Sequence, residues 1–158
     1  PASVVALHPG ASEIVPLALR ERAASLVFLH TALFPKETAA RKAYLKDFLA
    51  PNEGVPIVTV RVTYSDGQTA EIPIRVGMEV GSWLPQRTGE YLVRCPYLVR
   101  VQTPQAKAQE SGKADAVLYT YEWPNPRPGT RIDQIAIKHN GEDAAYALLG
   151  LSRRSLQE

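Results

Sequence analysis

The first of the two tryptophans, Trp83, has the clearest potential for recognition chemistry. It follows Gly77 and Gly81 after a predicted strand, a pattern typical of a loop that leaves part of the indole exposed. An exposed indole offers a large rigid surface on which the C–H face of a sugar ring can stack. The alternative is that Trp83 closes one end of a hydrophobic core.

Polar side chains surround the second tryptophan, Trp123. Glu122, Asn125 and Arg127 lie within four residues of it, and such groups donate hydrogen bonds to sugar hydroxyls or accept them. Two alternatives remain open. Trp123 continues an apolar alternation, which favours core packing, and Asn125 lies between two prolines, a stiff extended setting that suits bridging between loops.

His30 shares the apolar face of a predicted strand with Leu26 and Phe28. A histidine placed this way is a hydrogen-bonded core residue or part of a binding site, whereas metal ligation is least favoured because the three histidines lack HxH or HExxH spacing. The candidate carbohydrate-binding residues are therefore Trp83, Trp123, His30, Glu122, Asn125 and Arg127.

No pattern in the sequence predicts catalysis. There is no Gly-x-Ser-x-Gly turn and no Gly-rich phosphate loop. The single cysteine, Cys95, excludes an intrachain disulfide and a Cys-based zinc site. Glu79, Glu90 and Glu122 could meet in space as glycosidase carboxylates, which we rank last. We expect no catalytic residue, no cofactor and no metal ligand.

Composition indicates an ordinary globular protein. The chain has 158 residues, 45% of them hydrophobic and 22% charged, which suits one domain over residues 1–158. Its 18 basic and 16 acidic residues are scattered, so we expect no nucleic-acid partner. We expect no membrane span either. Because the chain begins at Pro1, we interpret it as a segment of a larger protein.

Alternation of apolar and polar residues dominates the chain and predicts strands. It is clearest over residues 58–64 and 70–76, which flank Asp66-Gly67, a strong hairpin pattern. The sequence predicts about eight or nine short strands in a sandwich or barrel, an all-β fold. Residues 36–49 are expected to form one short helix or an insertion loop.

Four segments of the sequence form a recognisable series: Ser25 to Ala32, Val62 to Gly67, Ile72 to Trp83, and Tyr121 to Pro128 with Ile132 and Ile135. In order and spacing they resemble the galactose-binding-like accessory domains of bacterial glycoside hydrolases and related secreted proteins. The resemblance covers roughly residues 14–151 and implies an antiparallel jelly-roll β-sandwich of about eight strands, whose end loops hold ligand. Structural calcium is common in that family, but no Asp-rich calcium loop is visible here.

The resemblance implies a non-catalytic module that targets a parent enzyme to glycan. Its partners would be a polysaccharide or oligosaccharide and the neighbouring domains of the parent, in a secreted, periplasmic or cell-surface location. The alternative is a structural or docking domain that mediates interdomain contacts or self-association without a sugar ligand.

Overall fold

The computed structural model describes residues 5–8, 14–33, 55–76, 78–83, 98–102 and 117–155. These residues form nine strands and their connections, and no helix occurs among them. The strands are β1 (Val5–Leu7), β2 (Ile14–Glu21), β3 (Ser25–Leu33), β4 (Val55–Tyr64), β5 (Thr69–Val76), β6 (Leu98–Gln102), β7 (Val117–Pro124), β8 (Ile132–His139) and β9 (Ala145–Arg154).

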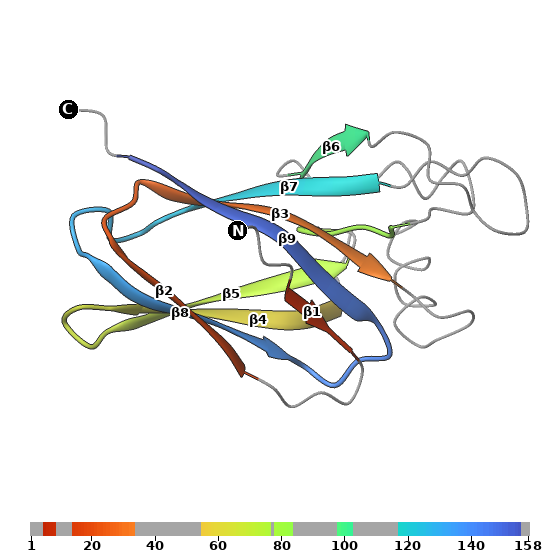
Figure 1. The fold of residues 1–158 in the computed structure, drawn as a ribbon, viewed down its shortest axis with the longest axis horizontal. Coiled ribbons are helices and arrows are strands. Elements are labelled where there is room, and N and C mark those ends of the chain that lie inside the picture. Colours follow the sequence, from red (N-terminus) through yellow and green to blue (C-terminus); the bar gives the residue numbers. More distant parts are fainter. Residues whose placement is uncertain are drawn as a thin grey trace, which may run out of the picture.

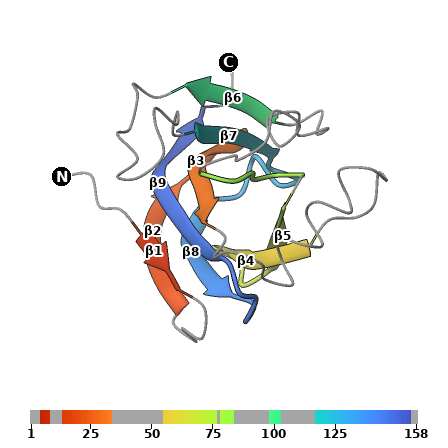
Figure 2. The ribbon, with the colours of Figure 1, turned by 90° about the vertical axis from the view of Figure 1, so that its right-hand side faces the viewer.

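The strands form two antiparallel sheets stacked face to face (Figures 1 and 2). Sheet A has the order β1-β9-β3-β7-β6 and sheet B the order β2-β8-β4-β5. In Figure 1, β3, β7 and β9 lie in the upper layer, above β2, β4, β5 and β8. Six of the eight consecutive strand pairs lie in different sheets, and the order β1-β9-β3-β7 opposite β2-β8-β4-β5 is that of a jelly roll. The predicted all-β sandwich is confirmed.

The β4–β5 hairpin shows why the alternating pattern produces this arrangement. Val58, Val60 and Val62 are fully buried on the inner face of sheet B, whereas the residues between them face outward. At the turn, Gly67 has a φ of 82°, a conformation that only glycine adopts without strain. The hairpin predicted from Asp66-Gly67 is confirmed.

Sheet A follows the same rule, with one interruption. On β3, Leu26, Phe28 and Ala32 are fully buried on its inner face. The pairing of β3 with β9 shifts between Leu29 and His30, which leaves Leu149 as the extra residue of a β-bulge. The bulge allows both halves of β9 to keep their apolar side chains inward.

Two sequence predictions fall outside the described residues. The helix or insertion expected at residues 36–49 cannot be compared with the structure, and the same holds for Cys95. Apolar and polar residues also alternate over residues 91–101, and the structure describes this segment only from Leu98 onward, as β6. The strand count is close to the expected one, and β6, at the edge of sheet A beside β7, is the ninth strand beyond the eight of the jelly-roll order.

Gly81 provides a test of how tightly the inner face of sheet A is packed. A Cβ added at Gly81 would lie 2.5 Å from Cζ of Tyr119, whose ring is buried. We predict that Gly81→Ala lowers the free energy of unfolding by roughly 1–3 kcal/mol in chemical denaturation. The added methyl group would force the Tyr119 ring to move, and the packed core leaves no space for it. At Gly129 an added Cβ meets nothing within 4 Å, so Gly129→Ala is the matched control and should stay within about 0.5 kcal/mol of the wild type. Equal stability of both variants would contradict this packing.

Candidate functional site

The structure divides the six candidate residues between the two ends of β3. Trp123 pairs with Leu26 near the start of β3, whereas the Trp83 amide donates to the carbonyl of Ala32 at the other end (2.7 Å). Six strand residues separate these points, about 20 Å at the usual rise. The two tryptophans therefore do not line a common shallow site.

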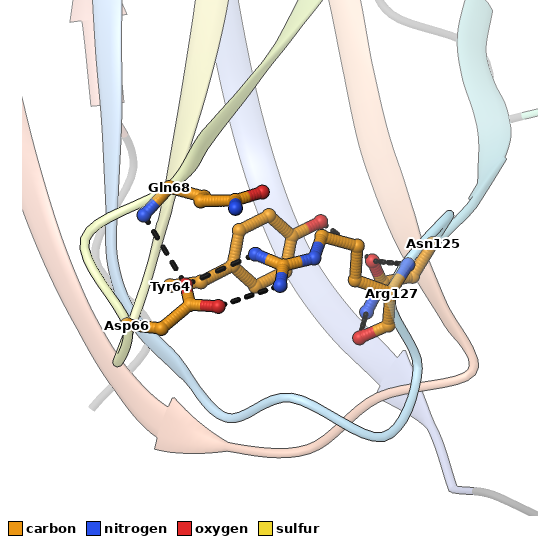
Figure 3. A network of polar contacts seen from close by, with 5 residues as sticks. All are labelled: Tyr64, Asp66, Gln68, Asn125 and Arg127. Atoms are coloured by element: carbon orange, nitrogen blue, oxygen red, sulfur yellow. Dashed lines mark hydrogen bonds and ion pairs between the residues drawn. The ribbon is translucent and has the colours of Figure 1, made fainter.

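Asn125 is buried at the Trp123 end and ties three segments together (Figure 3). Its Oδ1 accepts hydrogen bonds from the hydroxyl of Tyr64 (2.6 Å) and from the amide of Arg127 (3.0 Å). Its Nδ2 donates to the carbonyl of Ala23 at 2.8 Å. The amide thus links β4 of sheet B, the β2–β3 connection and the β7–β8 loop, which fits the bridging role that the flanking prolines suggested.

Arg127 is held in the same network. Its guanidinium forms two hydrogen bonds with Asp66, at 3.0 and 2.5 Å, and lies 5.0 Å above the ring centre of Tyr64 (Figure 3). These hydrogen bonds from Arg127 hold the pKa of Asp66 below its usual value. A ligand that used Arg127 would have to compete with Asp66.

Glu122 and Trp123 also have partners within the fold. Glu122 accepts a hydrogen bond from the Ser25 hydroxyl (2.5 Å) and forms an ion pair with Arg154 (3.0 Å). Trp123 is half-buried and packs against the core. Together with Asn125 and Arg127, these residues connect the strands and loops at one end of the sandwich. Most of their hydrogen-bonding groups already have partners within the fold, so few are left to bind a sugar.

His30 is fully buried between the sheets. Its Nδ1 lies 2.9 Å from the hydroxyl of Tyr146 and its Nε2 2.8 Å from the carbonyl of Glu79. Because a carbonyl can only accept, Nε2 carries the proton and Nδ1 accepts from Tyr146. Burial lowers the pKa of His30 to about 4, against a weaker opposing effect of the Glu79 hydrogen bond. His30 is a neutral core residue.

Trp83 occupies a different setting, on the outer side of sheet A. Its backbone joins two strands, because its amide donates to Ala32 and its carbonyl accepts from the amide of Val117 (2.9 Å). Its half-buried side chain lines an open groove of about 310 Å³. The groove is bordered by β1, β3 and β9, and its outward-facing members are Ala6, His8, Thr31, Leu33, Trp83, Ala145, Ala147 and Leu149.

The groove is almost wholly apolar. Leu33 is 51% exposed, and it is the one large hydrophobic side chain that is exposed among the described residues. The Thr31 hydroxyl is already used, since it donates to the carbonyl of Val117 at 3.1 Å. Among the described residues of the lining, His8 is the one side chain that can carry a charge near neutral pH. Sequence reasoning missed this surface, although apolar residues at the outward positions of residues 31–33 and 145–149 indicate it.

The outer face of sheet B has the opposite character. Arg61 and Glu71 form an exposed ion pair there at 2.7 Å, and Lys138 and Asn140 lie beside them. A solvent-facing sheet usually carries such polar side chains. The outer face of sheet A is unusual because the described residues of its groove are mostly apolar, whereas those on the outer face of sheet B include charged side chains.

The described residues hold no cluster of the side chains that most often bind metals. Across the parts of the chain that the structure describes, no three His, Cys, Asp or Glu side chains lie close enough to hold a metal ion. In the same residues there is no helix long and apolar enough to cross a membrane.

The buried neutral His30 predicts a dependence of stability on pH. Between pH 6.5 and about 4 the unfolded chain binds a proton at this residue and the folded chain does not, so acid favours unfolding. We predict that this group alone lowers the free energy of unfolding by about 3 kcal/mol as the pH falls through that window. Denaturation of the wild type and of His30→Gln at several pH values measures the difference in slope. Identical slopes would contradict a neutral buried histidine.

Comparison of the chain with protein-family models, with curated proteins and with solved structures found no match. Sheet order and register therefore show a jelly-roll β-sandwich and no family.

Proposed function

We propose that this domain is a non-catalytic accessory module of the galactose-binding-like kind, which docks through the outer face of sheet A on an uncharged, apolar surface of a neighbouring protein domain. The observation that carries the proposal is the apolar groove around Leu33 and Trp83, set against the charged outer face of sheet B. The sequence resemblance supports the accessory role, because such modules accompany larger enzymes.

The chemistry of the groove determines the kind of partner. The described residues of its lining include no Asp, Glu, Lys or Arg, so a charged group placed against them would lose water and gain no charged partner there. Apolar side chains would gain about 25 cal/mol for each Å² removed from water. Exposed apolar patches on a soluble domain commonly mark such interfaces. An aliphatic or aromatic protein surface fits the groove best.

A sugar ligand is the second candidate, and the half-buried indole of Trp83 favours it. One face of a pyranose ring could stack on this side chain. The groove offers few groups for the sugar hydroxyls among the described residues, since the Thr31 and Tyr146 hydroxyls are engaged and leave His8 and the indole N–H of Trp83. Binding would be weak, with a Kd of about a millimolar, or near −4 kcal/mol.

Leu33→Glu tests the docking proposal. The side chain is exposed, so the variant should fold, but it puts an unpaired charge on the proposed interface. With the adjacent domain of the parent polypeptide produced as a separate chain, calorimetry should show binding of the wild type and an affinity weaker by roughly tenfold or more for the variant. Thr69→Glu adds the same charge at an exposed position of sheet B and should bind as the wild type does.

The same proteins separate the two candidates. If the adjacent domain does not bind the wild type, or binds Leu33→Glu equally well, docking through this face is wrong. Affinity electrophoresis in polysaccharide gels then tests the sugar: retardation that is lost in Trp83→Ala and kept in Trp123→Ala would place a glycan on the groove.

A further inference from the structure

Arg20 adopts a backbone conformation that its residue type disfavours. Its φ is 55°, the one positive φ outside glycine among the described residues. It lies where the pairing of β2 with β8 shifts, between Ala18 and Glu21. A bulge that needs this conformation usually takes glycine, because a Cβ crowds the backbone there. Backbone strain at a non-glycine residue is concentrated at functional positions in proteins.

The side chain of Arg20 is available for a functional role. It is exposed and makes no hydrogen bond or ion pair with another described residue. It lines an open groove of about 660 Å³ on sheet B, together with Ala18, Arg131, Asp133 and Gln134. This groove lies on the sheet opposite the one that carries Trp83.

The other polar groups in the groove leave it with a net positive charge. Arg131 donates from Nε to Oδ1 of Asp133 at 2.8 Å, which neutralises that carboxylate. The Nη atoms of Arg131 make no bond to another described residue. Arg20 therefore contributes a free guanidinium, Arg131 two further donors, and Gln134 an amide.

We infer that this groove binds an oxyanion, a carboxylate or sulfate group, which Arg20 holds by paired N–H donors with help from Arg131. The planar guanidinium fork matches two oxygens of such a group, and this geometry makes arginine the preferred residue for the task. The oxyanion belongs to an acidic sugar unit or is free in solution, and the chemistry of the groove is the same for both. The inference goes beyond the docking role and does not depend on it.

Nitrogen-15 NMR of the arginine Nε–H groups tests this site directly. We expect oligogalacturonate and sodium sulfate to shift the Arg20 signal saturably, and a neutral oligogalactose of equal length to leave it unchanged. Arg20→Gln should weaken binding roughly tenfold, and added NaCl should weaken binding to the wild type. Arg61→Gln is the matched control, since Arg61 lies on the same face but is paired with Glu71.

Arg20→Gly separates binding from a structural role. Glycine suits the positive φ, so this variant should melt at the same temperature as the wild type or higher, and yet lose the anion. Saturable shifts with oligogalacturonate but not with sulfate would assign the site to an acidic glycan, and the reverse would assign it to a free oxyanion. The inference is overturned if no anion produces a saturable shift, if the neutral sugar binds equally well, or if Arg20→Gln binds like the wild type.

Discussion

The sandwich depends on keeping water out of the space between sheets A and B. Most of that space is filled by branched aliphatic and aromatic side chains from the inner faces of both sheets. Some polar atoms must enter it, and each one that is buried costs free energy unless it finds a partner there. Among the described residues, every buried side-chain nitrogen and oxygen has one.

Because buried polar atoms need partners, a buried polar residue that resembles part of a binding site can instead serve to make an internal hydrogen bond. His30 and Asn125 are polar residues in apolar surroundings, a pattern that suits ligand recognition as well as it suits an internal bond. The geometry favours the internal bond, because His30 joins Tyr146 to Glu79 and Asn125 joins both sheets. The surfaces that remain for recognition are the outer faces of the sheets. There Leu33 is an exposed large apolar side chain, and Arg20 has a positive φ although it is not glycine.

Local sequence was sufficient to predict much of the fold. Alternation with period two identified the strands, and Asp66-Gly67 identified the hairpin, because both depend on near neighbours. The partners of Asn125 could not be predicted in the same way, since Tyr64 lies 61 residues away and meets it only when the sheets close. The bulges at Arg20 and Leu149 also escaped prediction, because a register shift reflects two strands at once.

The candidate site was predicted less well than the fold, for a related reason. Sequence identifies which residue types can bind a sugar but not which of their polar atoms are already satisfied. Trp83 and Trp123 are both candidates in the sequence, and only the contacts that each makes with β3 place them at opposite ends of that strand. The apolar groove was accessible to sequence reasoning through outward residues such as Leu33 and Ala147, which belong to strands apolar on both faces.

The buried polar residues hold the two sheets together, and Asn125 makes the most such contacts at one end of the sandwich. Asn125→Ala should therefore lower the free energy of unfolding by about 2–4 kcal/mol, because it leaves the Ala23 carbonyl and the Tyr64 hydroxyl buried without their partner. Asn140→Ala removes an exposed amide that also joins two strands, and should cost about 1 kcal/mol or less. Chemical denaturation of both variants decides the matter. If both variants lose the same small amount of unfolding free energy, the structural role of Asn125 is contradicted. Asn125 would then again be a candidate for binding a ligand.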